Sequence, residues 1–168
     1  MNLQQRRQQI VLAHIESENA HDFDATARTF ARPRYEVAPT GETLVGDEAV
    51  KRFLLETHRA FPDMRFETRA LHHADEAVIA ETAFSGTHLG EWRGLPPTRR
   101  SVRYAMCNIY VFEDDALVCE RLNFDRLTIL MQLGLAEDPA SARGRLQTLL
   151  CHPIVVGTAF ARSWLGGE

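Results

Sequence analysis

Four strand-like stretches follow one another between residues 64 and 125, and they restrict the chain to folds built on a meandering sheet. The expected strands are 64–72, 77–88, 101–112 and 117–125. Alternate residues of the third stretch share one strand face: Val102, Tyr104, Met106, Asn108, Tyr110 and Phe112. Because turns or a single loop join successive stretches, we expect neighbouring strands to pair antiparallel.

Helical patterns stand on both sides of this meander. Residues 3–20 lack Gly and Pro, a second helix ends before Pro33, and 47–61 has a strongly apolar face. A short hairpin at 35–45 interrupts these helices, and a further helix should end at Gly134. Helices segregated from a meander predict an α+β domain. In our interpretation a curved antiparallel sheet wraps around the N-terminal helices as a cone with a pocket at its mouth.

A length of 168 residues suits one domain with a substantial core. We assign residues 1–134 to that domain and 135–168 to a helical extension that packs on the same domain or on a dimer partner. Asp138 and Pro139 are expected to begin a helix in this extension. Its last apolar stretch, 154–165, is too short to span a membrane.

Charge and cysteine content argue against several classes of partner. The net charge is −4 and the arginines are scattered, so neither nucleic acid nor an anionic membrane is expected to bind.

The three cysteines, Cys107, Cys119 and Cys151, are odd in number and have no close pairing, which indicates free thiols in a reducing compartment. Together with an N-terminus unlike a signal peptide, this predicts a cytoplasmic protein.

Asp125 and His88 are the candidate catalytic pair, because each stands at the end of an expected strand. A carboxylate and a neutral imidazole form an acid–base set that works near neutral pH. Each residue also has a structural alternative. Asp125 can cap the helix that follows it, and His88 can satisfy a backbone carbonyl in its own bend.

A pocket for a small hydrophobic molecule would be lined by polar and aromatic side chains. Asn123 and Arg121 share a strand face with Asp125, and Arg121 could pair with that carboxylate and weaken it as a base. The candidate substrate-binding residues are Asn123, Tyr104, Asn108, Trp92, Phe53, Phe61 and Phe84. The aromatic members of this set equally suit the core.

The motifs of cofactor-dependent and nucleophilic enzymes are missing from the chain. His72 and His73 are adjacent, so a strand would point them to opposite faces, and no Cys or His at metal-ligand spacing supports them. The chain has no nucleophile elbow and no phosphate-binding loop. We therefore expect no metal site and no cofactor.

Several short motifs, taken in order, resemble the SnoaL-like polyketide cyclase family of the nuclear transport factor two-like, ketosteroid isomerase-like superfamily. They are Phe61-Pro62-Asp63-Met64, Gly86-Thr87-His88-Leu89-Gly90, Pro96-Pro97-Thr98, and the segment from Asp125 to Gly134. The resemblance covers about residues 9–134. It implies a cone-shaped α+β fold, usually a homodimer formed through the sheet, with an apolar pocket and no cofactor.

The resemblance also implies a chemistry. In characterised cyclases of this family an aspartate acts as acid and base in an intramolecular aldol closure, and Asp125 stands at the matching place. His88 matches the histidine of the family's GTH motif. The expected function is a cofactor-free cyclase or isomerase acting on a small hydrophobic carbonyl compound. The alternatives are a non-catalytic binding or dimerisation module and an epoxide hydrolase-like enzyme, which would need two carboxylates and a polar partner around a water.

Overall fold

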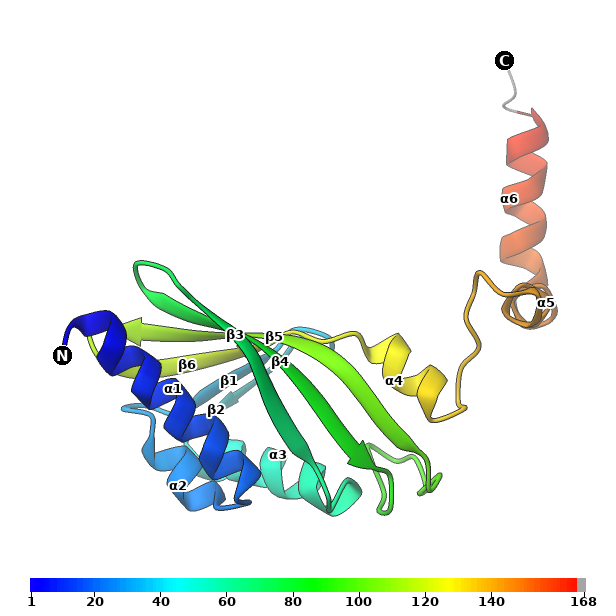
Figure 1. Ribbon diagram of the computed structural model, residues 1–168. Coiled ribbons are helices and arrows are strands. Elements are labelled where there is room, and N and C mark those ends of the chain that lie inside the picture. The colour runs from blue at the N-terminus through cyan, green and yellow to red at the C-terminus, as the bar shows by residue number, and fades with distance from the viewer. Residues whose placement is uncertain (166–168) are drawn as a thin grey trace. The chain divides into compact units, whose positions relative to one another are not determined.

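The computed structural model describes residues 1–165, and the chain divides into two compact units at residues 133 and 134. The first unit contains both the helices and the sheet expected from the sequence (Figure 1). The second contains helices only. The three residues that end the predicted extension, 166–168, lie outside the described part.

Three helices form one layer of the first unit: α1 (Leu3–Asn19), α2 (Phe23–Arg28) and α3 (Asp47–Ala60). Helix α1 begins with a capping box, in which the Gln5 backbone N–H donates to Asn2 Oδ1 at 2.8 Å and the Asn2 N–H donates to Gln5 Oε1 at 3.0 Å. Its buried face includes Val11 and Ile15, which anchor it in the core.

The other layer is one six-stranded sheet with the order β2-β1-β6-β5-β4-β3. The strands are β1 (Arg34–Val37), β2 (Glu42–Val45), β3 (Arg65–His73), β4 (Ala77–Thr87), β5 (Ser101–Glu113) and β6 (Ala116–Leu122). The four-stranded antiparallel meander is confirmed. The small hairpin joins the same sheet, because β1 pairs parallel with β6. Strand β6 ends at Leu122 rather than Asp125, although Phe124 still forms one bridge with Met106.

The long strands β3 to β5 bend around the helices, so that one face of the sheet encloses the core (Figure 1). The predicted inner face of β5 is confirmed, since Val102, Met106, Asn108, Tyr110 and Phe112 are all buried. Tyr104 lies opposite Phe84 of β4 and Tyr110 lies opposite Glu120 of β6. This register brings aromatic and polar side chains to the same inner surface.

Helix α4 (Arg126–Gln132) completes the first unit, and the second holds α5 (Ala142–Cys151) and α6 (Pro153–Leu165). The predicted helix start at Asp138 is wrong. Ser141 is the N-cap of α5 and accepts from the Gly144 N–H at 3.0 Å, while Asp138 accepts from Ala140 in the preceding turn. Within residues 1–165 no helix has the length and apolar character needed to span a membrane.

Candidate active site

A cavity lies between the helices and the inner face of the sheet. Most of its wall is apolar and aromatic: Tyr35, Phe53, Phe61, Phe66, Phe84, Trp92, Tyr104 and Phe124 line it together with Leu54, Met64, Met106, Leu122 and Ile129. Six of the residues proposed to bind substrate from the sequence are in the wall: Phe53, Phe61, Phe84, Trp92, Tyr104 and Asn108. Such a wall suits a small hydrophobic molecule.

The polar side chains on this wall are Glu18, Tyr35, Thr57, Arg93 and Asn108, together with the hydroxyl of Tyr104 and the indole N–H of Trp92. Arg93 is held by Glu42 at 2.7 Å. Glu18 belongs instead to a cluster of side chains buried in the core.

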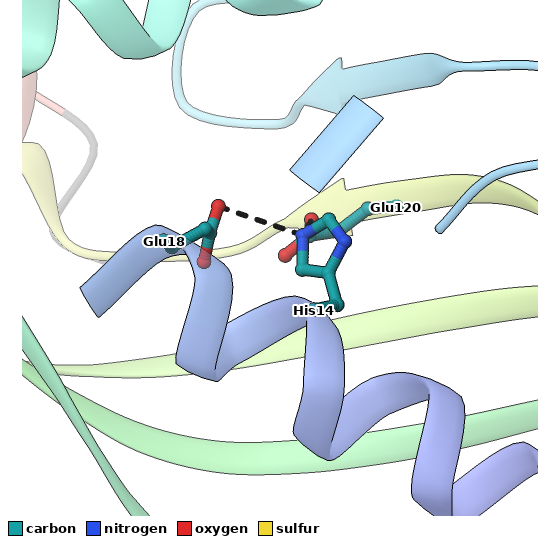
Figure 2. A group of neighbouring side chains, drawn as sticks. All are labelled: His14, Glu18 and Glu120. Atoms are coloured by element: carbon teal, nitrogen blue, oxygen red, sulfur yellow. Dashed lines mark ion pairs between the residues drawn. The ribbon is translucent and has the colours of Figure 1, made fainter. Parts of the chain in front are cut away.

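Three ionisable side chains meet in this buried cluster, which we call the His14 cluster (Figure 2). It consists of His14 and Glu18 from α1 and Glu120 from β6, none more than 3% exposed. His14 Nε2 lies 3.0 Å from Glu120 Oε2 and 3.5 Å from Glu18 Oε1. An i, i+4 spacing on α1 points His14 and Glu18 to the same side, and the β1–β6–β5 pairing brings Glu120 beneath them.

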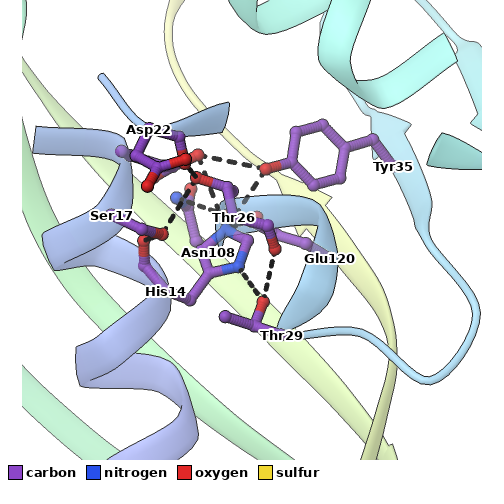
Figure 3. Close-up of polar contacts among 9 residues, drawn as sticks. His14, Ser17, Asp22, Thr26, Thr29, Tyr35, Asn108 and Glu120 are labelled. Atoms are coloured by element: carbon purple, nitrogen blue, oxygen red, sulfur yellow. Dashed lines mark hydrogen bonds and ion pairs between the residues drawn. The ribbon is translucent and has the colours of Figure 1, made fainter. Parts of the chain in front are cut away.

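Hydrogen bonds orient the members of the cluster (Figure 3). The Thr29 hydroxyl donates to the Thr26 carbonyl at 2.7 Å, so it accepts from His14 Nδ1, also at 2.7 Å. The Tyr35 hydroxyl donates to Glu18 Oε1 at 3.0 Å, and Asn108 Nδ2 donates to Glu120 Oε1 at 3.0 Å. The cluster is thus connected to the cavity through Glu18, Tyr35 and Asn108.

Burial and charge act against each other in the protonation of this cluster. Burial by itself lowers the pKa of His14, but the carboxylates of Glu18 and Glu120 outweigh it and raise that pKa to about 10. Burial raises the pKa of Glu18, and the nearby His14 opposes the rise. At neutral pH the imidazole therefore carries a proton, while Glu18 is a carboxyl that takes up a proton more readily than an exposed one.

His88 is fully buried but does not line the cavity. Its Nδ1 accepts from the Thr98 backbone N–H at 3.2 Å, and its ring stacks on Phe61 with centroids 5.2 Å apart. Burial lowers its pKa, and its Nε2 has no hydrogen-bond partner. The ring holds the 89–100 loop against Phe61.

Asp125 is exposed and caps α4, which is the structural alternative considered for it. Its Oδ1 accepts from the Leu127 N–H at 2.9 Å and its Oδ2 from the Thr128 hydroxyl, and these bonds lower its pKa. Neither Asp125 nor Asn123 lines the cavity, and Arg121 pairs with Glu36 at 2.8 Å instead of with Asp125. The structure does not bring Asp125 and His88 together at the cavity, and their catalytic pairing stays a prediction.

Sequence reasoning missed the His14 cluster. The expectation of no metal site considered ligands close in sequence, whereas Glu120 comes from a strand about a hundred residues after α1. One signal was available, since His14 and Glu18 continue the apolar helical face of Val11 and Ile15. Two ionisable groups on a core-facing stripe need buried partners.

Comparison with known proteins agrees with this architecture. The model of the SnoaL-like polyketide cyclase family matches residues 8–133. The chain belongs to this family. No curated protein matches the sequence significantly. The SnoaL-like match ends where the first structural unit ends, so the family assignment concerns that unit.

Solved structures show the same fold over the SnoaL-like unit. AclR from Streptomyces galilaeus is 19% identical, with a TM-score of 0.70 over 84% of this chain and 97% of that one. IdmH from Streptomyces antibioticus is 25% identical, with a TM-score of 0.65 over 76% of this chain and 98% of that one. A Catenulispora acidiphila protein with a ketosteroid isomerase-like fold is 17% identical, with a TM-score of 0.65 over 75% of this chain and 92% of that one.

Proposed function

We propose that the protein is an acid–base enzyme of the cyclase or isomerase kind that acts on a small, hydrophobic, carbonyl-containing metabolite. The observation that carries this proposal is the pairing of Glu18 with Tyr35 in the wall of an otherwise aromatic cavity. A buried carboxyl with a raised pKa is suited to both accepting and returning a proton.

The proposed reaction begins with removal of a proton from the carbon next to the carbonyl. Ionised Glu18 takes that proton, and the Tyr35 hydroxyl, which donates to Glu18 Oε1 in the free protein, turns to donate its hydrogen bond to the oxygen that becomes the enolate. The enolate then either regains the proton from Glu18 at another carbon, which is an isomerisation, or attacks a second carbonyl and closes a ring. In the second case Glu18 returns its proton to the alkoxide that the attack forms. The dry aromatic wall strengthens each of these polar interactions.

The test is a screen of β-keto esters and enolisable ketones with two matched variants, Glu18→Gln and Asp125→Asn. Each replaces a carboxylate by its isosteric amide. We expect Glu18→Gln to lower kcat at least about a hundredfold, the usual range for loss of an acid–base group, while Asp125→Asn keeps most activity. The reverse pattern would restore Asp125 as the catalytic residue and overturn the role of Glu18.

Epoxide hydrolysis is the second candidate, because the His14 cluster provides the two inward carboxylates and the polar partner that such chemistry requires. Glu18 and Glu120 are the carboxylates, and Asn108 is bonded to Glu120. Only Glu18 and Asn108 of these three line the cavity. Incubation of hydrophobic epoxides in ¹⁸O-labelled water separates the candidates, since only hydrolysis places the label in a diol.

The non-catalytic alternative is a binding or dimerisation module with the same fold. It predicts tight binding of hydrophobic probes to the cavity with no turnover of any substrate class in either screen.

The homodimer expected for the family remains part of our proposal. The outer face of β5 presents the exposed residues Ala105 and Cys107, which are small enough to allow a second sheet to approach. Sedimentation velocity measures this association directly.

A further inference from the structure

We propose that the His14 cluster is a binding site for one divalent transition-metal ion, with His14 Nε2 and one carboxylate oxygen each from Glu18 and Glu120 as ligands. Among residues 1–165 this is the only group of three such donors close enough together to share an ion, and all lie within 4.8 Å of one another. The inference goes beyond the proposed function and does not depend on it, although both use the carboxylate of Glu18.

The donor spacing matches that of ligands around a metal. Bonds of about 2.0–2.2 Å from zinc to nitrogen and oxygen place neighbouring ligands about 3.0–3.5 Å apart in octahedral or tetrahedral sites. The observed separations from His14 Nε2 are 3.0 Å to Glu120 Oε2 and 3.5 Å to Glu18 Oε1. Both separations from the imidazole therefore suit an ion that takes the place of the proton on Nε2.

Surrounding hydrogen bonds leave the required atoms free for the ion. The Nδ1–H of His14 is used by Thr29, which directs Nε2 toward the two carboxylates. Asn108 occupies Oε1 of Glu120, whereas the buried Oε2 contacts His14 Nε2 at 3.0 Å, on the side from which the ion would bind. A buried carboxylate needs a cation beside it; the His14 imidazolium supplies that charge in the metal-free protein, and a bound ion would supply it in place of the Nε2 proton.

The cluster also has the charge and the access that an ion needs. Two carboxylates and a neutral imidazole balance one divalent cation, and this ligand set favours Zn²⁺, Mn²⁺ or Fe²⁺ over Ca²⁺, which prefers six or more oxygen ligands. Glu18 lies in the cavity wall, so a fourth ligand can come from the cavity side. There the ion would polarise a carbonyl oxygen or activate a water.

The experiment uses the full chain after EDTA treatment and dialysis, with Zn²⁺ and Co²⁺ as probes. We expect one ion per chain by isothermal titration calorimetry. We also expect Tm to rise by roughly 5–10 °C when free metal exceeds Kd about a hundredfold. The Co²⁺ form should show visible ligand-field bands without the near-ultraviolet charge-transfer band of a thiolate ligand, which excludes binding at the cysteines.

Glu120→Gln should abolish the stoichiometric site, because its amide is a much weaker ligand. The matched control is Glu81→Gln, which alters the exposed His72–Glu81 pair at 2.9 Å and should leave binding intact. If Glu120→Gln fails to fold, paramagnetic broadening of the His14 ring resonances by Co²⁺ in the unaltered protein tests the same point. Absence of a 1:1 site, unbroadened His14 signals, or unchanged binding by folded Glu120→Gln would overturn the proposal. None of these results depends on turnover of a substrate.

Discussion

At the scale of single residues, two fully buried histidines have pKa values shifted in opposite directions. His14 is surrounded by carboxylates that raise its pKa to about 10, whereas His88 has no nearby charge to oppose burial, which lowers its pKa. The folded protein thus holds one imidazole charged and the other neutral at pH 7. Each state has a distinct effect on the dependence of stability on pH.

For His14 we predict a loss of stability at alkaline pH in the metal-free protein. The folded pKa lies above the unfolded value of 6.5, so this contribution is complete below pH 6.5 and is lost as pH rises toward about 10. The slope approaches about 1.4 kcal/mol per pH unit at most. Urea unfolding between pH 6.5 and 10 measures it. In His14→Asn the unfolding free energy should not fall with pH in this way, whereas His72→Asn should behave like the unaltered protein. Equal slopes of unfolding free energy against pH in the unaltered protein and both variants would contradict the role of His14.

For His88 the sign is reversed. Its folded pKa lies below 6.5, so the unfolded ring binds a proton first, and stability present above pH 6.5 is lost as pH falls through the folded pKa. The contribution of His88 is measured by subtracting the unfolding free energy of His88→Gln from that of the unaltered protein at pH 4.5–7.5. We expect this difference to shrink as the pH falls. A difference that grows as the pH falls would show that the ring is charged in the folded state.

At the scale of elements, the loop from Leu89 to Arg100 depends on a close backbone approach to the end of α3. The Gly90 N–H donates to the Ala60 carbonyl at 3.1 Å, and a Cβ at Gly90 would lie 2.1 Å from the Arg59 carbonyl oxygen. Only glycine allows this contact. The contact positions Trp92, which follows two residues later in the loop and lines the cavity.

Gly90→Ala is therefore expected to destabilise the protein by about 1–3 kcal/mol, the usual cost of forcing extra volume into a packed site. Urea unfolding measures the loss, and acrylamide quenching in a Trp164→Phe background reports on the exposure of Trp92. The matched control is Gly157→Ala in α6, where no atom lies within 4 Å of the added Cβ and the helix should gain slightly. Equal stability of the two variants would show that the loop does not need this approach.

At the scale of the whole molecule, the core and the cavity belong entirely to the first unit. Residues 1–133 form one compact unit with its own hydrophobic core, and the family match ends at the same residue. The second unit buries little of its apolar surface: Leu150, Ile154, Val155, Phe160 and Trp164 are all exposed. Such a surface favours association. The predicted packing of this extension on the domain or a dimer partner stays a prediction.

A chain shortened to residues 1–134 should therefore fold on its own core and keep its metal and probe binding. It should also self-associate less, because the exposed apolar residues of α5 and α6 are removed. Differential scanning calorimetry and sedimentation velocity measure the two effects. An unfolded product would show that the first unit requires the extension.

The sequence alone determined three features of this protein: the order of the elements, the inner face of β5 and the family of the chain. These features depend on local periodicity, turn residues and short motifs, which can be found directly in the sequence. Three of the six cavity residues predicted from the sequence, Phe84, Tyr104 and Asn108, lie on strand faces that periodicity assigns to the core, whereas Phe53 lies on the apolar face of α3. Periodicity states which face is buried but not which buried groups meet.

Only the tertiary structure shows which ionisable side chains meet in the core and which lie at the cavity. Asp125 stands at a strand-to-helix junction in either interpretation, and only the fold shows that its carboxylate is exposed and occupied by the cap. His14, Glu18 and Glu120 form a cluster because parallel pairing of β1 with β6 carries a distant carboxylate beneath α1. Contacts between residues so far apart depend on the packing of whole elements, and no local pattern records that packing.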